Sequence, residues 1–181
     1  LPNVCVRACS PEGEILGHGK IGSIQISGPN VFKGYWGMPE KTAEEFTDDG
    51  FFITGDLGII SEDGYLSIVG RSKDLIISGG FNVYPKEVER VLDEMPGIIE
   101  SAVFSYPDAD FGEGVAAAIV VKTGFDLDYS SIRSACKFKV ASFKCPRRVF
   151  VLTEIPRNAM GKVQKNILRN DYIKYNELCS G

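Results

Sequence analysis

The apolar residues of this chain change their spacing near Ser72, and this change constrains the fold more than any other feature. Before Ser72, apolar and polar residues alternate over residues 4–6 and 22–27, as they do in half-buried β-strands. After Ser72, segments with helical spacing alternate with short apolar runs. This order predicts an α+β protein in which a β-rich part, residues 1–71, precedes a mixed part, residues 72–181.

Turn and capping residues indicate where the expected helices and strands begin and end. Pro39 opens one short helix in the first part, and Gly-containing turns bound strands at 51–54 and 65–69. Predicted strands of the second part lie at 75–77, 98–106, 115–122 and 148–152, and predicted helices at 86–95, 129–143 and 163–178. The domain boundary is expected in the short polar stretch 70–74.

Charge and cysteine content argue against several classes of protein. The 181 residues carry a net charge of −4, which disfavours non-specific binding to nucleic acid or anionic membranes. No apolar run is long enough to span a bilayer. The five cysteines form no C-x-x-C pair and only one histidine is present, so we expect reduced thiols, no metal site and a cytoplasmic location. The start at Leu1, without an initiator Met, suggests a piece of a longer protein.

Three short segments carry residues suited to chemistry. The first, residues 53–57, is interpreted as a strand that ends in Thr-Gly-Asp and leaves the carboxylate of Asp56 at a turn. Two oxygens of one carboxylate can accept hydrogen bonds from two vicinal hydroxyls, such as those of a ribose. A carboxylate that only caps its own turn explains the same three residues.

The second segment, residues 70–85, combines charged residues, a short strand and a Gly-Gly turn. The guanidinium of Arg71 could hold a phosphate or a ribose through its fork of donors. Glycine lets a backbone fold tightly or come close to a ligand. A β-turn with surface charges explains this segment equally well, and it matches neither a G-x-G-x-x-G nor a P-loop motif.

The third segment, residues 156–169, places Gly161 before Lys162 on a loop that opens the last helix. From there the ammonium group could project into a neighbouring site and stabilise negative charge on a phosphate. A solvated surface lysine is the alternative explanation for this segment alone.

In this order and spacing, the three segments resemble the adenylate-forming superfamily, which includes acyl-CoA synthetases, firefly luciferases and the adenylation domains of peptide synthetases. The resemblance runs from about residue 20 to residue 169 and also covers the segments 34–36, 106–108, 112–113 and 143–146. The amino-acid sequences of residues 28–36 and 80–85 are most similar to those of the malonyl-CoA synthetases.

The resemblance implies nucleotide-binding and catalytic roles for three residues. Asp56 would bind the ribose hydroxyls of ATP and AMP, and Arg71 would assist at the ribose and phosphate. Lys162 would be the catalytic residue, because it would reach the carboxylate and α-phosphate oxygens while an acyl-adenylate forms. The basic set, Lys137, Lys139, Lys144, Arg147 and Arg148, either contacts the phosphates of CoA or forms solvated surface charges.

The resemblance also implies that residues 72–181 form a mobile C-terminal lid domain. Lys73 would be the hinge about which this domain turns between two half-reactions, at a position where many members carry Asp. Gly79 and Gly80 would lie against the pantetheine arm of CoA. Residues 1–71 would be a small β-rich subdomain at the end of a large N-terminal AMP-binding domain.

The reaction implied is the conversion of a carboxylate, ATP and CoA to acyl-CoA, AMP and pyrophosphate through an acyl-adenylate, with Mg²⁺. The phosphate loop, the acyl pocket and the magnesium-binding Glu of the superfamily are absent from these 181 residues. We therefore expect the isolated chain to be inactive and its missing N-terminal domain to be its partner. The other expected partners are the carboxylate, ATP and CoA, with no nucleic acid and no membrane span.

Three alternatives to a malonyl-CoA synthetase remain open at this point. One is a medium- or long-chain fatty-acid–CoA ligase. Another is an adenylation domain that loads a carrier protein, in which case a carrier domain should follow. The third is a non-catalytic module derived from this fold, which would have no need to retain Asp56, Arg71, Gly80 and Lys162.

Overall fold

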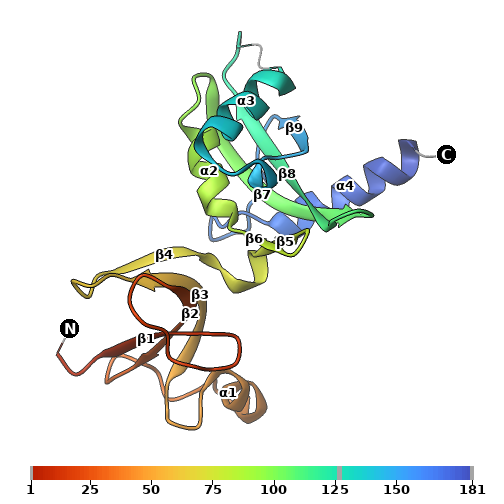
Figure 1. The fold of residues 1–181 in the computed structure, drawn as a ribbon. Helices are drawn as coiled ribbons and strands as arrows, with labels where there is room; N and C mark the ends of the chain where they lie inside the picture. Colours follow the sequence, from red (N-terminus) through yellow and green to blue (C-terminus); the bar gives the residue numbers. More distant parts are fainter. Residues whose placement is uncertain (1, 126–127, 180–181) are drawn as a thin grey trace. The chain divides into compact units, whose positions relative to one another are not determined.

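The computed structural model describes residues 2–125 and 128–179, with side chains described as far as Tyr172. The chain forms two compact units, Leu1–Lys73 and Asp74–Gly181 (Figure 1). The functional division proposed at residues 71/72 remains a prediction. Within the described ranges, no helix is both long enough and apolar enough to cross a membrane.

The first unit is a four-stranded antiparallel sheet with one short helix. Its elements are β1 (Cys5–Cys9), β2 (Ile21–Ser27), α1 (Pro39–Glu45), β3 (Phe52–Ile60) and β4 (Leu66–Arg71). The strands pair in chain order, β1-β2-β3-β4, and each is antiparallel to the next. Pro39 stands in the first turn of α1, where its missing N–H costs nothing.

An ion pair fastens the edge strand β1 to the turn before β3. Both terminal nitrogens of Arg7 donate to the carboxylate of Asp49, at 2.6 and 2.9 Å. The same guanidinium lies 3.8 Å from the ring centroid of Phe51, and its Nε donates to Gln25. The hydrogen bonds from Arg7 lower the pKa of Asp49 to about 2.

The second unit combines one sheet with three α-helices. Its elements are β5 (Ile76–Ser78), β6 (Phe81–Val83), α2 (Pro85–Asp93), β7 (Ile98–Asp108), β8 (Gly112–Val121), α3 (Tyr129–Lys139), β9 (Arg148–Leu152) and α4 (Lys165–Cys179). The strand order is β6-β5-β8-β7, and β9 pairs in parallel with β8. Antiparallel and parallel pairs in one sheet, with helices on it, confirm the predicted α+β class.

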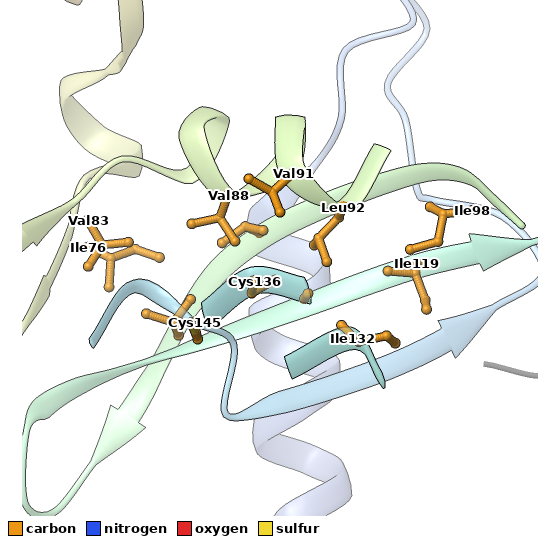
Figure 2. Packing of buried hydrophobic residues seen from close by; sticks show 13 residues of the cluster. Ile76, Val83, Val88, Val91, Leu92, Ile98, Ile119, Ile132, Cys136 and Cys145 are labelled. Atoms are coloured by element: carbon orange, nitrogen blue, oxygen red, sulfur yellow. The ribbon is translucent and has the colours of Figure 1, made fainter. Parts of the chain in front are cut away.

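The alternating faces of β8 separate two apolar cores. Val115, Ala117 and Ile119 pack with the buried residues of α2 and α3 (Figure 2). Ala116 and Ala118 pack on the opposite face with residues of α4. Helices α2 and α3 therefore cover one face of the sheet and α4 covers the other, which explains why β8 reads as a continuous apolar run.

The second unit differs from the prediction by a few residues at several element ends, and most at the end of α3 and at β6. Helix α3 ends at Lys139, four residues early, because Val140 is extended and packs against the core. A short 3₁₀ turn, η2 (Ser142–Lys144), follows it. The prediction also missed strand β6, which pairs with β5 after the Gly-Gly turn.

The described cysteines, Cys5, Cys9, Cys136 and Cys145, are free thiols, and the side chain of Cys179 lies outside the described residues. Burial raises the pKa of Cys136 to about 11, so this thiol is a poor nucleophile at neutral pH.

Candidate functional site

The sequence predicted that Asp56 stands at the end of a strand. In the structure it lies within β3 instead. The strand continues to Ile60, and its pairing with β2 shifts register at the Thr-Gly-Asp segment. Gly55 has a φ of +72° there, a conformation that glycine adopts without strain. Such a bulge can redirect a side chain while the strand goes on.

Asp56 and Arg71 face each other across β3 and β4. They are partners in the register of the two strands, and Arg71 Nε lies 3.0 Å from Asp56 Oδ1. Both side chains stay accessible, with 29% of Asp56 and 47% of Arg71 exposed. In the described part of the chain, Oδ2 of Asp56 makes no hydrogen bond, so this oxygen can accept one from a ligand.

Thr54 connects this pair to the rest of the sheet. Its hydroxyl donates to the carbonyl oxygen of Ile24 at 2.8 Å and accepts the N–H of Asp56 at 3.1 Å. Its carbonyl oxygen accepts a hydrogen bond from Nη1 of Arg71 at 3.0 Å. Backbone groups of the sheet therefore set the positions of both the carboxylate and the guanidinium.

The pair borders a hollow of about 790 Å³ in the first unit. The hollow is lined by Tyr35, Glu45, residues 52–56 and residues 71–73. Tyr35 donates its hydroxyl to Glu45 at 2.5 Å, and this hydrogen bond raises the pKa of Tyr35. Sequence reasoning included Thr54 in the Thr-Gly-Asp segment but gave it no role, and it did not propose Glu45 as a site residue. Their contacts with Ile24 and Tyr35 follow only from the folded structure.

Lys73 also lines this hollow and ends the first unit. It is the middle residue of the 3₁₀ turn η1 (Ser72–Asp74), and its side chain is exposed. Residues 72–75 lie outside both sheets, so the passage between the two units is held by few backbone hydrogen bonds.

Gly79 and Gly80 form the two-residue turn between β5 and β6. Both have positive φ, +57° and +81°, which this type of hairpin turn requires and which favours glycine. The N–H of Gly79 donates to the carbonyl of Phe111 at 2.9 Å, and a Cβ on Gly79 would lie 2.9 Å from that ring. A Cβ on Gly80 would meet nothing within 4 Å, so Gly80 borders open space.

Lys162 lies on a closed loop between β9 and α4. Arg157 and Val163 form an isolated antiparallel bridge at the base of the loop. Asn158 donates its N–H to the carbonyl of Lys162, and its side-chain Oδ1 accepts the N–H of Lys162, both at 2.9 Å. Gly161, with a φ of +77°, closes the turn. The loop therefore fixes the backbone of Lys162 while its side chain is exposed.

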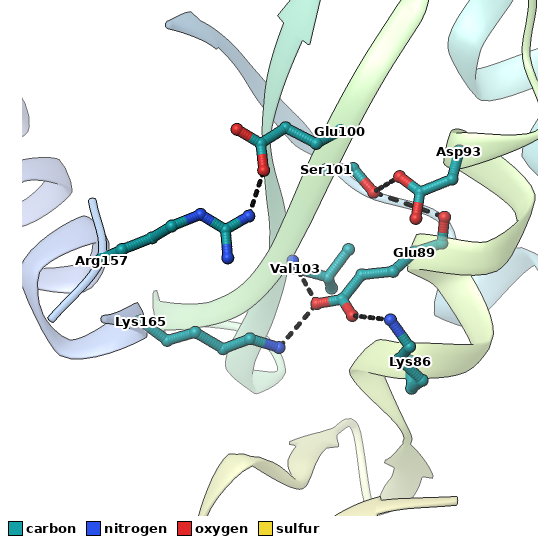
Figure 3. A network of polar contacts seen from close by, with 8 residues as sticks. All are labelled: Lys86, Glu89, Asp93, Glu100, Ser101, Val103, Arg157 and Lys165. Atoms are coloured by element: carbon teal, nitrogen blue, oxygen red, sulfur yellow. Dashed lines mark hydrogen bonds and ion pairs between the residues drawn. The ribbon is translucent and has the colours of Figure 1, made fainter. Parts of the chain in front are cut away.

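Lys162 and Lys165 have very different surroundings, although only two residues separate them. The ammonium group of Lys162 forms no ion pair with any residue that the structure describes. Lys165 is 16% exposed, and its Nζ lies 2.7 Å from Oε1 of Glu89 (Figure 3). Of the two, Lys162 can reach a ligand without breaking a buried ion pair.

The predicted basic set divides into paired and unpaired members. Two of its lysines form ion pairs within the chain: Lys139–Glu94 and Lys144–Glu87. The guanidinium of Arg147 lies 3.7 Å from the ring centroid of Phe111. Lys137 and Arg148 make no ion pair with the residues described. The set is therefore not one free cationic patch.

The predicted site residues fall into two groups. Asp56, Arg71 and Lys73 share one hollow in the first unit. Gly79, Gly80 and Lys162 belong to the second unit, where they lie on two exposed turns. Among the side chains that the structure describes, which end at Tyr172, no three from His, Cys, Asp or Glu gather as a set of metal ligands.

A family comparison matches residues 87–162 to the AMP-binding enzyme C-terminal domain. The match begins in α2 and ends at Lys162. Among curated relatives, FadD13 of Mycobacterium tuberculosis, a long-chain-fatty-acid–CoA ligase, is 44% identical over 94% of this chain and 33% of its own length. The chain therefore spans about a third of the length of the curated relatives it matches.

Solved structures of adenylate-forming enzymes also match this chain over about a third of their own length. ATP-bound MatB from Rhodopseudomonas palustris is 56% identical, with a TM-score of 0.90 over 95% of this chain and 34% of MatB. Apo MatB from the same organism is 57% identical, with a TM-score of 0.71 over the same shares. The amide bond synthetase McbA from Marinactinospora thermotolerans is 37% identical, with a TM-score of 0.89 over 94% of this chain and 34% of McbA.

Proposed function

Because this chain belongs to the adenylate-forming, AMP-binding enzyme family and is the C-terminal part of such an enzyme, we propose that the whole protein is an ATP-dependent acyl-CoA synthetase. The observation that carries the proposal is that the polar groups of Asp56, Arg71 and Lys162 are accessible to a ligand. The first two share an accessible hollow, and the third has an unpaired cation on an ordered loop.

In the first half-reaction, a carboxylate oxygen attacks the α-phosphorus of ATP, an acyl-adenylate forms and pyrophosphate leaves. The proposed role of Asp56 is to accept hydrogen bonds from the ribose hydroxyls, for which Oδ2 is available. Nε and Nη1 of Arg71 are held by Asp56 and Thr54, and Nη2 can donate to the ribose or phosphate, since the guanidinium is half exposed. The ammonium group of Lys162 offsets the negative charge that builds up on the reacting oxygens.

In the second half-reaction, the thiolate of CoA attacks the acyl carbon and AMP leaves. Gly80 is suited to border the pantetheine arm, because the side on which a Cβ would stand is open. Lys73 is the proposed hinge between the two half-reactions. Its support is the position of Lys73 in a short segment, residues 72–75, that lies outside both sheets.

Magnesium belongs to the same proposal, with its ligand in the N-terminal domain. The described residues offer no grouped carboxylates for it. We also propose a cytoplasmic location, supported by the free state of the described thiols.

The finer proposal is that the carboxylate is malonate. Its support is the resemblance of residues 28–36 and 80–85 to the malonyl-CoA synthetases. The chain is also 56% identical to MatB, compared with 44% to FadD13. The acyl pocket lies outside this chain, so a fatty-acid–CoA ligase and an enzyme that loads a carrier protein are the competing outcomes.

The experiment is an assay of the full-length protein with ATP, CoA and a panel of carboxylates: malonate, acetate, octanoate and palmitate. We expect AMP release that depends on both malonate and CoA, with malonyl-CoA as the product. A preference for octanoate or palmitate would overturn the malonate assignment and keep the synthetase. Product formation with an amine or a carrier protein, and none with CoA, would overturn the synthetase itself. Residues 1–181 alone should release no AMP, because the main triphosphate contacts are missing.

A further inference from the structure

The carboxylate of Glu89 on α2 is buried between α2, β7 and the start of α4 (Figure 3). Glu89 is 6% exposed. Its Oε1 accepts the N–H of Val103 at 2.9 Å and the ammonium group of Lys165 at 2.7 Å. Lys86 adds a weaker ion pair, with Nζ 3.6 Å from Oε2. A buried carboxylate is costly unless it is paired, so Glu89 and Lys165 depend on each other.

The sheet fixes Glu89 from its other side. Within the described part of the chain, β7 pairs with β8 alone, so one edge of β7 presents backbone groups without strand partners. Val103 belongs to β7, and Glu89 accepts its N–H. A backbone donor of a long strand therefore sets the position of the carboxylate, which in turn sets the position of the ammonium group of Lys165.

Lys165 is the first residue of α4 and directly follows the Lys162 loop. The N–H of Gln164 donates to the carbonyl of Pro156 at 2.8 Å, which joins the two ends of the loop. The ion pair with Glu89 thus fixes the place where the loop runs into the helix. Lys162 stands three residues before this anchor.

Arg157 provides a second anchor at the start of the loop. Its guanidinium forms an ion pair with Glu100 of β7 (Figure 3). The same group donates to the carbonyl of Gly161 at 2.8 Å. Glu100 is about a third exposed, whereas Glu89 is buried, so the Glu89 anchor is less screened by solvent. The two anchors tie both ends of the loop to β7.

We propose that Glu89 is a positioning residue for Lys162, acting through Lys165 and the start of α4. It holds the loop in the place from which the Lys162 ammonium group meets the reacting oxygens. The inference rests on the proposed role of Lys162. Glu89 itself touches no substrate, so its effect should appear only in the half-reaction that uses Lys162.

The test uses the full-length enzyme and four variants: Glu89→Gln, Lys162→Ala, the double variant, and Glu94→Gln as control. Glu94 ends the same helix and forms an exposed ion pair with Lys139 that is unconnected to the loop. Glu89→Gln should lower the turnover number of adenylation about tenfold, because a catalytic group is displaced. The reaction of preformed acyl-adenylate with CoA should change less than about twofold. In the Lys162→Ala background, Glu89→Gln should cause no further loss of adenylation.

Hydrogen exchange gives a readout that does not depend on activity. The amides of residues 157–163 should exchange faster in Glu89→Gln than in the wild type or in Glu94→Gln. If Lys162→Ala slows adenylation but Glu89→Gln does not, the positioning role is wrong and the proposed function stands. If both half-reactions fall together in Glu89→Gln, Glu89 is a structural residue only. If Lys162→Ala leaves adenylation unchanged, the role of Lys162 and the positioning role both fail.

A second pair of variants covers the case in which Glu89→Gln does not fold. Lys165→Arg and Lys165→Gln can both donate to Glu89, but only arginine keeps the ion pair. Lys165→Arg should retain adenylation within about threefold of the wild type, and Lys165→Gln should lose about tenfold. Equal adenylation rates in these two variants would overturn the proposal.

Discussion

Nε of Arg71 lies 3.0 Å from Oδ1 of Asp56, across two neighbouring strands. Both side chains are partly exposed, and such ion pairs contribute little to folding, about 0.2–1 kcal/mol. Their geometry is nevertheless well defined, because Thr54 holds both residues through backbone groups. This geometry agrees with the ligand-binding role that we propose for the pair.

Asp56→Asn tests this role. The amide keeps the shape of the side chain but loses the charge that makes an acceptor for hydroxyls strong. In the full-length enzyme, we expect the affinity for ATP to fall roughly ten- to hundredfold, the range for losing hydrogen bonds to a charged group. The urea midpoint of unfolding should change little. A large loss of stability with unchanged ATP affinity would show that Asp56 only caps the bulge in β3.

Replacing Gly79 or Gly80 by alanine should affect thermal stability and the CoA-dependent half-reaction to different extents. Both substitutions strain a backbone with positive φ. Gly79→Ala also brings a Cβ to 2.9 Å from the ring of Phe111, so it should lower thermal stability more. Gly80→Ala should fold nearly normally and slow the CoA-dependent half-reaction, since its methyl group would enter the space proposed for pantetheine. Equal CoA-dependent rates in Gly80→Ala and the wild type would remove Gly80 from the CoA site.

Much of the fold could be predicted from the sequence, because local patterns and the core agree. Strand β9 was predicted at its observed bounds, since an apolar run between a proline and a polar turn has few alternatives. The end of α3 was not, because Val140 leaves the helix for contacts with distant residues. For the same reason the sequence could point to Asp56 and Lys162 but gave no role to Thr54, Glu45 or Glu89. Each of these three has a partner that is distant along the chain: Ile24 for Thr54, Tyr35 for Glu45 and Lys165 for Glu89, which are 30, 10 and 76 positions away.

Lys73→Pro should separate the two half-reactions. Proline fixes φ and removes an N–H, and it restricts the residue before it, so the passage between the units loses freedom. Adenylation in the full-length enzyme should survive better than thioester formation. Lys73→Ala is the matched control, because it removes the side chain and leaves the backbone free. Equal losses in pyrophosphate exchange and in the reaction of adenylate with CoA would contradict a hinge at this position.

The Arg7–Asp49 ion pair predicts a pH dependence of the first unit. The pKa of Asp49 is lowered from 3.8 to about 2 in the folded chain, so the pair stabilises the fold above the unfolded value. This contribution should be lost as the pH falls from about 4 toward 2. Asp49→Asn should therefore lower the urea midpoint at pH 7, and the difference from the wild type should shrink below pH 4. Asp48→Asn, at an exposed neighbour, is the control. A difference that stays constant down to pH 2 would mean that the charge of Asp49 is unimportant.

Lys162→Ala is the most direct test of the proposed chemistry. In the proposed mechanism, the exposed ammonium group stabilises charge only while the adenylate forms, so its loss should raise the barrier of that step by about 3 kcal/mol or more. This corresponds to a rate at least about a hundredfold lower. Preformed acyl-adenylate should still react with CoA at close to the wild-type rate, because Lys162 has no role there. Met160→Ala, on the same exposed turn, is the control for disturbance of the loop. If both half-reactions fall together, Lys162 is structural or acts in both steps. If neither falls, its role is wrong, and Lys165 is a poor replacement, because its ammonium group is already bound to buried Glu89.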